Sequence, residues 1–545
     1  MTEKPIRLGI VSFYKSEMKK LFYCALSLFL LMTSYYIMKA IRSSSFLHEF
    51  GAISLLPTYV INGILTFLAV IVYNKLAAKY DRRTLIKRVF LAVTLIFLGI
   101  WSLNFLVSKT NAKVPAAATT TATDTDTDTD TATATATDTD TDTDTDTDKI
   151  TAKDVLRKDV TAISNTQKIE GLDNNSNNPP KSGKTFSAFL KSLFTVNKIM
   201  ILINYFTVCI YILILTALLW SLINVVLTSS QASRLVGIIL LAGQGGASLG
   251  GRITKMLAKS LGTMNLIPIS LLILGATYLA MQKIQEFDTK DSNKKENKDT
   301  TEDSSNSTNK KSKKEPAKPE KKSSGSLSDL RDLIKHPYAR VIGILILFSM
   351  FAVTTVDWQF NEMLEKQITG KDAKTEFFGQ YYEWQGLINI GLLILAGKVI
   401  PLFGPAAGLL LLPIIAIIAS INFFFAKTLG VAVWLWLLCH STNYTFYNAG
   451  KEVLYSPAER EVKVRFKPLN DAAGYRGGDA AAAIFIGSYL LLLPGVAVSG
   501  IGIAVLVAGF LWIPTIFKAN KMYYKAIKNN NKNESPLTKQ PDPQE

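Results

Sequence analysis

The sequence predicts an all-α integral membrane protein with about twelve transmembrane helices arranged as two halves of six. Three observations lead to this fold class. Apolar runs recur along the chain, and at about 20 residues and about 1.5 Å per residue each can cross a bilayer core of roughly 30 Å. The 545 residues are 48% hydrophobic yet include 60 basic and 43 acidic residues, so apolar and charged residues lie in separate blocks. A Lys-rich polar stretch divides the runs into two sets.

Each apolar run is predicted to be a helix because backbone polar groups in lipid must be satisfied within their own segment. The predicted spans are residues 21–38, 53–73, 88–107, 199–226, 235–257, 263–281, 340–358, 377–397, 405–425, 430–449, 476–495 and 498–517. A basic stretch precedes the first run without a small-residue cleavage site. We therefore expect a retained helix there and no signal peptide.

Two segments between the spans are predicted to be disordered. Residues 116–148 are a Thr-Asp and Thr-Ala repeat, and residues 285–330 are rich in Lys, Ser, Asn and Glu. Neither can bury enough apolar surface to offset the conformational entropy lost on folding. The predicted organisation is 1–108 (first three spans), 109–190 (external Thr/Asp-rich loop), 191–284 (spans four to six), 285–335 (Lys-rich cytoplasmic linker), 336–520 (last six spans) and 521–545 (cytoplasmic tail). Six plus six spans are typical of major-facilitator-type transporters, in which two similar halves move around a central site.

Basic residues predict the orientation. Lysine and arginine gather before the first span, between spans two and three, between spans ten and eleven, and after the last span. Such clusters mark the cytoplasmic side, so both termini are expected in the cytoplasm and the Thr-Asp loop outside. Arg252, Lys255 and Lys259 disagree, because they follow span five and would face outward. The alternative for these three residues is that they face the transport pathway.

Several function classes are not expected. The clusters that set orientation account for the net charge of +17, so no nucleic-acid partner is predicted. Three widely spaced cysteines and three scattered histidines indicate no disulfide framework, no metal site and no cofactor. The glycine-rich stretch 243–251 lacks the ending of a phosphate-binding loop and is predicted to be a helix-packing surface. No pattern of catalytic residues is present in the sequence, so an enzyme is not expected.

Charged residues in or beside the spans are the candidate functional residues. A charge buried in lipid is energetically costly, so it is expected to have an oppositely charged partner or a functional role. Lys39 and Arg42 are three positions apart and share one helix face, where they suit phosphate oxygens. The alternative is that both are flanking anchors whose charges reach the interface. Asp357, Glu383 and Asp479 also need partners, and their alternative role is a structural ion pair between helices.

The densest charged stretch covers residues 451–479. Acids alternate with bases there, whereas a cytoplasmic anchor needs only bases. The alternation predicts a network of salt bridges that break and form again as the halves move, and the alternative is an ordinary basic loop. The predicted members of this gating network are Lys451, Glu452, Glu461, Lys463, Asp471 and Asp479.

This stretch resembles the bacterial and plastid nucleotide transporter family, the ATP/ADP translocases of obligate intracellular bacteria and plastids. The family pattern is approximately Ser-Thr-Lys-Tyr, then Lys-Glu-x-x-Tyr-x-Pro, then Glu-x-Lys-Val-Lys-x-Lys-x-x-x-Asp. The matching residues are Ser441, Thr442, Tyr444, Lys451, Glu452, Tyr455, Pro457, Glu461, Lys463, Val464, Arg465, Lys467 and Asp471. Weaker matches, such as Trp220 and Asn224, extend the resemblance over essentially all spans.

The resemblance implies a multi-pass protein of a bacterial inner membrane that exchanges ATP for ADP by alternating access and hydrolyses neither. Its expected partners are a nucleotide and the lipid bilayer, and a monomer is expected. The implied phosphate ligands are Lys39, Arg42, Lys467 and Arg476. The residues expected along the pathway are Trp220, Asn224, Asp357, Glu383 and Asn443.

Some positions depart from the family pattern. Ala40 replaces an acidic residue, Val208 and Thr355 replace two membrane glutamates, and Asn443 replaces the lysine of Ser-Thr-Lys-Tyr. These changes leave a different nucleotide or a proton-coupled mode open. The alternative function is a major-facilitator-type proton-coupled transporter of another solute, whose cytoplasmic loop signature resembles residues 81–83. A third hypothesis is a membrane scaffold or receptor without transport.

Overall fold

The computed structural model describes residues 6–8, 11–112, 196–302, 327–425, 429–459, 461–493 and 498–534. Contacts divide the chain into two units, one formed by Met1–Asn104 with Pro179–Glu545 and the other by Phe105–Asn178. The described part of the second unit is the end of helix α3, from Phe105 to Ala112. The Thr-Asp repeat lies outside the described residues. The following description concerns the first unit.

The first six spans correspond to six helices, which we call the N-terminal half. They are α1 (Met18–Phe50), α2 (Leu55–Lys79), α3 (Arg82–Ala112), α6 (Val196–Val226), α7 (Ser229–Leu261) and α8 (Leu266–Glu302). An antiparallel hairpin of β1 (Ile6–Leu8) and β2 (Val11–Phe13), in which Arg7 pairs with Ser12, precedes α1. The sequence did not predict this hairpin. It is the one departure from an all-helical fold in the described part of the chain.

The last six spans correspond to the C-terminal half. Its helices are α10 (Pro337–Gln367), α11 (Lys371–Phe403), α12 (Pro405–Phe425), α13 (Leu429–Thr442), α14 (Asn448–Tyr455), α15 (Lys467–Leu492) and α16 (Gly502–Glu534), preceded by the short α9 (Leu327–Lys335). A π-helical turn, Asn443–Tyr447, joins α13 to α14, and a second one, Val462–Phe466, leads into α15. The tenth span is therefore a helix interrupted by a π-turn.

All twelve predicted spans lie on helices, and nine helices of the described residues are long and apolar enough to cross a membrane. Two boundaries were wrong. Helix α8 continues to Glu302, and α9 is helical, although both helices enter the linker that was predicted to be disordered. Residues 303–326 of this linker lie outside the described residues. Residues 285–302 contain neither glycine nor proline, so a helix that starts in the membrane can continue through them. Helix α16 likewise extends to Glu534, into the predicted tail.

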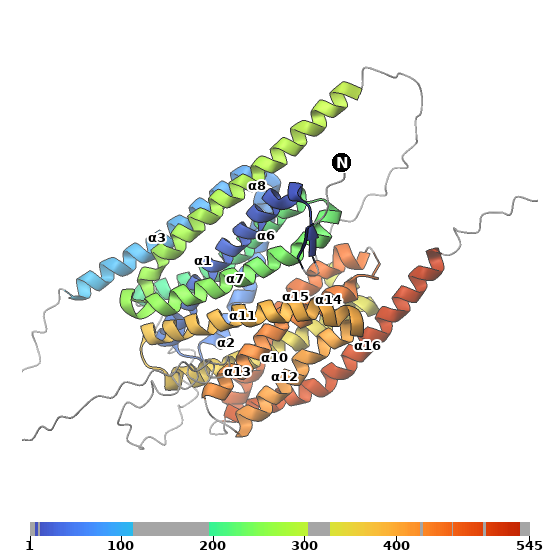
Figure 1. Ribbon diagram of the computed structural model, residues 1–545. Coiled ribbons are helices and arrows are strands. Elements are labelled where there is room, and N and C mark those ends of the chain that lie inside the picture. The colour runs from blue at the N-terminus through green and yellow to red at the C-terminus, as the bar shows by residue number, and fades with distance from the viewer. Residues whose placement is uncertain are drawn as a thin grey trace, which may run out of the picture. The chain divides into compact units, whose positions relative to one another are not determined.

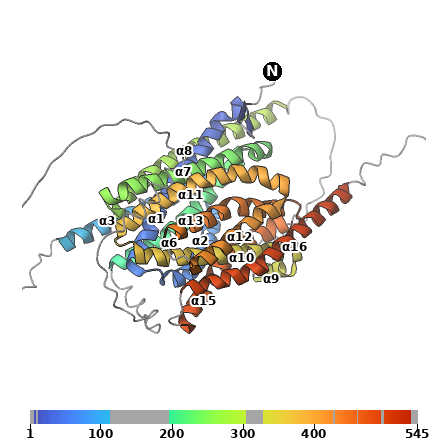
Figure 2. The ribbon, with the colours of Figure 1, turned by 60° about the horizontal axis from the view of Figure 1, so that its bottom comes forward.

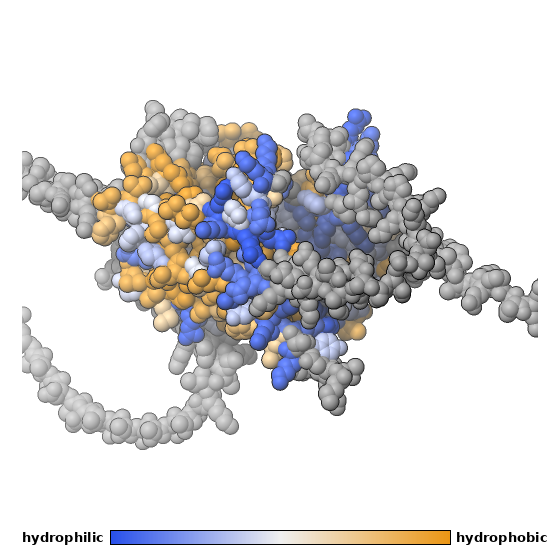
Figure 3. Space-filling model, turned by 90° about the horizontal axis from the view of Figure 1, so that it is seen from above, coloured by the Kyte–Doolittle hydropathy of each residue, from blue (hydrophilic) through white to orange (hydrophobic). Residues whose placement is uncertain are grey.

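Each half of the helix bundle (Figure 1, Figure 2) has buried apolar side chains at its centre, and the cluster of the N-terminal half also includes Trp358, Ala483 and Ile486 of the C-terminal half. In the N-terminal half α1 packs against α6, α7 and α8, and Leu31, Ile41 and Leu219 are fully buried between them. In the C-terminal half α10 packs against α15 and α16, and Ile346 and Ile516 are fully buried. Large apolar side chains also cover much of the surface, which is suited to contact with lipid (Figure 3).

Helices α7 and α11 run side by side and join the halves at very short range (Figure 1, Figure 2). A Cβ atom on Gly251 would lie 2.3 Å from the backbone nitrogen of Glu383. A Cβ atom on Gly386 would lie 2.5 Å from the backbone nitrogen of Ser248. On another face of α7, a Cβ atom on Gly246 would lie 2.1 Å from the Phe29 carbonyl of α1. The predicted packing role of the glycine-rich stretch is therefore confirmed.

Ion pairs follow the glycines along the same two helices. Glu383 of α11 lies 3.7 Å from the Lys255 amine and 4.0 Å from the Arg252 guanidinium, both on α7. One helical turn further, the Lys259 amine lies 2.7 Å from the Glu376 carboxylate. These are the three bases that disagreed with the predicted orientation. They belong to a helix and have acidic partners, so they are not a free basic loop, and Glu383 takes its alternative role as a structural ion pair.

Further contacts between the halves lie at the end where α1 and α10 terminate. The backbone N–H of Ala52, just after α1, donates to the Glu365 carboxylate at 2.6 Å. The Trp358 indole donates to the Ala52 carbonyl at 3.0 Å. The backbone N–H of Thr263, after α7, donates to the Asp372 carboxylate at 2.8 Å, near the start of α11. These contacts hold the two halves together at one end of the helices.

Candidate functional site

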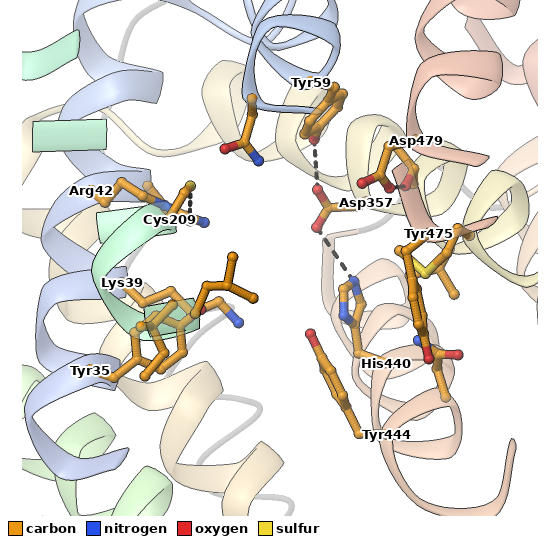
Figure 4. A pocket seen from close by; sticks show the side chains of 18 of the residues that line it. Tyr35, Lys39, Arg42, Tyr59, Cys209, Asp357, His440, Tyr444, Tyr475 and Asp479 are labelled. Carbon is orange, nitrogen blue, oxygen red and sulfur yellow. Dashed lines mark hydrogen bonds and ion pairs between the residues drawn. The ribbon is translucent and has the colours of Figure 1, made fainter. Parts of the chain in front are cut away.

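A cavity of about 690 Å³ lies between the two halves (Figure 4). Helices α1, α2 and α6 line it from the N-terminal half, and α10, α11, α13 and α15 line it from the C-terminal half. Its volume falls within the range of about 300–1,000 Å³ that is usual for small-molecule sites. Charged groups of opposite sign line its two sides.

Lys39 and Arg42 of α1 form the cationic wall of the cavity. The Lys39 amine lies 4.5 Å from the ring centre of Tyr382, and the Arg42 guanidinium lies 4.8 Å from that of Tyr205. Arg42 also donates to the Cys209 sulfur at 3.1 Å, while its buried Nε atom has no hydrogen-bond partner within the part of the chain that the structure describes. Among the described residues neither cation has a carboxylate within ion-pair distance. Aromatic faces therefore stabilise two charges that remain available to an anion.

Asp357 and Asp479 form the acidic wall on the opposite side (Figure 4). Asp357 of α10 accepts hydrogen bonds from the Tyr59 hydroxyl at 2.8 Å and from the Trp436 indole at 3.0 Å. The His440 Nε2 atom lies 3.4 Å from the same carboxylate. Because Tyr59 belongs to α2, Asp357 joins the two halves across the cavity. Asp479 accepts from the Thr354 hydroxyl at 2.7 Å.

The structure brings some of the predicted site residues together and separates others. Those that line the cavity are Lys39, Arg42, Trp220, Asp357, Asn443, Arg476 and Asp479. Those outside its lining are Asn224, Glu383, Lys451, Glu452, Glu461, Lys463, Lys467 and Asp471. Asn224 is exposed, and the Lys467 amine lies 2.5 Å from the Glu452 carboxylate. Lys467 is therefore paired with Glu452 and does not line the cavity, and its predicted phosphate contact stays a prediction.

The predicted gating network exists in part, within the C-terminal half. The buried Lys451 amine donates to the Asp471 carboxylate at 2.8 Å and to the Tyr475 hydroxyl at 3.1 Å. The Arg465 guanidinium lies 2.8 Å from the Glu461 carboxylate. Lys463 is exposed, and Asp479 instead pairs with Arg476, one turn away on α15, at 3.3 Å. The ion pairs of these described residues all lie within the C-terminal half, so the gating role remains a prediction.

The tyrosines of the cavity and His440 were not predicted from the sequence as site residues, whereas the aromatic Trp220 was. Tyr35, Tyr59, Tyr382, Tyr444 and Tyr475 all line it. A sequence signal existed for some of them. Tyr35 precedes Lys39 by four positions and Arg42 by seven, which places all three on one helix face. No comparable signal related the remaining residues, because they come from separate helices.

Residues 203–523 match the sequence profile of the family described as the TLC ATP/ADP transporter. The chain belongs to the TLC ATP/ADP transporter family. The resemblance inferred from the sequence is therefore confirmed, and the family is described as one of transporters, not of enzymes. The match begins after α1, so the cationic wall lies outside it.

Named relatives of this TLC family member are distant. The chain is 23% identical over 217 residues to ADP,ATP carrier protein 1 of Chlamydia trachomatis. The aligned region covers 36% of this chain and 41% of that protein. It is 21% identical over 216 residues to ADP,ATP carrier protein 4 of Rickettsia bellii, covering 35% of this chain and 42% of that protein. The chain thus spans about two fifths of the length of the curated relatives that it matches.

Solved structures share the fold of this TLC family member. A mutant of the peptide transporter POT in complex with sulfate has a TM-score of 0.53 at 12% identity, covering 92% of this chain and 95% of that chain. The peptide transporter POT in complex with sulfate has a TM-score of 0.50 at 11% identity, with the same coverage of both chains. The predicted major-facilitator-like fold is confirmed.

Proposed function

We propose that the chain carries nucleotides across a membrane, and that ATP and ADP are the pair it exchanges. The observation that carries this proposal is the cationic wall, in which Lys39 and Arg42 face the cavity without a carboxylate partner among the described residues (Figure 4). Membership of the TLC ATP/ADP transporter family and the names of the ADP,ATP carrier relatives support the same substrate class.

Electrostatics favour a phosphate chain as the cargo. Two cations held between helices in a membrane are costly to desolvate, and an anion that binds to both offsets this cost. The Arg42 guanidinium can bind phosphate oxygens in a bidentate manner. Asp357 and Asp479 on the acidic wall repel phosphates, so the phosphate chain would lie against α1. Arg476 would become a third phosphate ligand only when its ion pair with Asp479 opens.

Alternating access follows from where the halves touch. The contacts at Ala52 and at Thr263 lie at the ends at which α1, α7 and α10 terminate. In the orientation proposed from the basic loops, with both termini cytoplasmic, this is the external end. The structure would then be an inward-facing state of a monomer in a bacterial inner membrane. Breaking these contacts and forming new ones at the other end would release the nucleotide outside.

Transport by the purified full-length protein in vesicles tests the proposal. Vesicles loaded with ADP are expected to take up labelled ATP, and vesicles without internal nucleotide to take up much less. The double variant Lys39→Gln, Arg42→Gln is expected to lower the initial rate at least about tenfold, because each cation contributes a charge-assisted hydrogen bond. Lys283→Gln is a matched control on an exposed lysine of α8. A double variant as active as this control, or a wild type that moves no nucleotide, would show the proposal to be wrong.

A second candidate function is proton-coupled transport of another solute. The observation that favours it is the pairing of Asp357 with His440 inside the cavity, two groups that can exchange a proton with a pathway. Glu383, which was expected along the pathway, is paired with Lys255 of α7 instead. Uptake driven by a pH gradient in the absence of nucleotides, and lost in Asp357→Asn, would support this alternative over nucleotide exchange.

A further inference from the structure

The π-helical turn Asn443–Tyr447 brings two polar groups to the C-terminal-half side of the cavity. A π-turn widens the helix by one residue and is often found at functional sites. Here it breaks the regular hydrogen bonding between α13 and α14 at the level of His440 and the acidic wall (Figure 4). Its first two residues, Asn443 and Tyr444, both line the cavity.

Tyr444 presents an aromatic ring to the cavity (Figure 4). The residue is 44% exposed, and its nearest ring neighbour is His440, at 6.1 Å between ring centres. Trp436 in the same cavity differs, because Phe360 covers one face at 3.8 Å and Tyr381 stacks on it at 3.7 Å. Of these two rings, Tyr444 has the face that a planar ligand can still reach.

Asn443 supplies an unused hydrogen-bond acceptor beside this ring. The residue is 4% exposed, and its side-chain oxygen has no hydrogen-bond partner among the described residues. Asn448, which also lines the cavity, differs because its side-chain oxygen accepts from the Tyr475 hydroxyl at 2.8 Å. Leaving a buried amide oxygen without a donor is unfavourable, so a rotation of the Asn443 side chain toward the cavity would let this oxygen accept a hydrogen bond from a ligand there.

The opposite charges of the two walls set the direction in which a nucleotide enters. Its phosphates are attracted to Lys39 and Arg42 and repelled by Asp357, while the Arg476 guanidinium on the same side is paired with Asp479 at 3.3 Å. The base must therefore point toward the C-terminal half, where Tyr444 and its neighbours offer an aromatic face and amide groups. An acidic wall that is unfavourable for phosphates tolerates a neutral base that carries hydrogen-bond donors.

We propose that Asn443 and Tyr444 form the base subsite of the cavity. Tyr444 stacks on the base, and the Asn443 oxygen accepts a hydrogen bond from an exocyclic amino group, as an asparagine does with adenine. The subsite therefore selects amino-bearing bases such as adenine over bases with a carbonyl at the same position. This inference rests on the proposed nucleotide function, which it deepens by assigning the part of the substrate that the cationic wall does not hold.

Equilibrium binding to the purified full-length protein tests the subsite with three ligands. ATP carries the base and the phosphates, ITP differs from ATP by a carbonyl in place of the amino group, and inorganic tripolyphosphate has no base. The wild type is expected to bind ATP about tenfold more tightly than tripolyphosphate, from stacking. It is also expected to prefer ATP to ITP by about tenfold, from the hydrogen bond.

Variants separate the two contributions. Tyr444→Leu is expected to remove most of the advantage of ATP over tripolyphosphate, and Tyr444→Phe, which keeps the ring, to restore it. Asn443→Ala is expected to make ATP and ITP equivalent. A variant that loses tripolyphosphate in parallel with ATP would show that the residue supports the whole cavity, and this would overturn the assignment.

The wild-type result distinguishes the failure of the subsite from the failure of the proposed function. Equal affinity for ATP and ITP would overturn the role of Asn443. Tripolyphosphate binding as tight as ATP binding would overturn the base subsite and leave the phosphate site intact. Absence of binding for all three ligands would overturn the nucleotide function together with this inference.

Discussion

Replacement of Gly251 by alanine tests the closest approach between the two halves. The new Cβ atom would lie 2.3 Å from the Glu383 nitrogen and 2.6 Å from the Gly379 carbonyl oxygen. To reach the 3.4 Å at which ordinary contacts begin, α7 and α11 must separate locally by about 1.1 Å. Both obstructing atoms belong to a helix backbone, so no side chain can rotate to make room.

The magnitude is obtained by comparison with a second glycine of the same helix. Gly237, also on α7, has no atom within 4 Å of the position that a Cβ would occupy. Alanine is a better helix former than glycine by up to about 1 kcal/mol, and this gain is common to both variants. The difference between Gly251→Ala and Gly237→Ala therefore isolates the cost of overpacking, about 1–3 kcal/mol.

Thermal unfolding of the full-length protein in detergent, followed by tryptophan fluorescence at one heating rate, measures this difference. Gly251→Ala is expected to have a Tm several degrees below that of Gly237→Ala, whereas Gly237→Ala is expected to equal or exceed the wild type. Equal Tm values for the two variants would refute the reasoning, because they would mean that α7 and α11 do not meet at backbone distance.

Two further predictions concern ion pairs at the ends of the helices. Lys451→Met and Asp471→Asn are each expected to lower the Tm. Because the pair is partly buried, a double-mutant cycle on the free energy of unfolding is expected to show a coupling of about 1–2 kcal/mol between them. Additive effects of the two substitutions would contradict the contact. Burial alone would raise the pKa of Glu17, but hydrogen bonds from the Tyr14 N–H and the Arg234 guanidinium lower it below its usual value. The ionised form therefore stabilises the fold near neutral pH, and this contribution is lost as the pH falls through the carboxylate range. The Tm of the wild type should drop more on acidification than that of Glu17→Gln, and parallel curves would contradict the assignment.

Local sequence determined the helices of this protein. An apolar run in lipid has to satisfy its own backbone hydrogen bonds, so length and hydropathy alone located all twelve spans. Helical spacing also placed Lys39 and Arg42 on one face, because three positions on one helix remain neighbours in any fold. Helix α8 continues past its predicted end because residues 285–302 contain neither glycine nor proline, although their polar composition is typical of disorder.

Only the tertiary structure decided which charges are paired and which face the cavity. Lys467 and Arg476 are both basic residues of the same charged stretch, and the sequence does not distinguish their roles. In the structure Lys467 pairs with Glu452 outside the cavity, whereas Arg476 lines the cavity. Glu383 finds Lys255, more than a hundred residues away, because glycines let α7 and α11 approach closely. Such pairings depend on how distant helices pack against each other. The spacing of residues along one helix does not reveal which side chains of a distant helix will lie next to them.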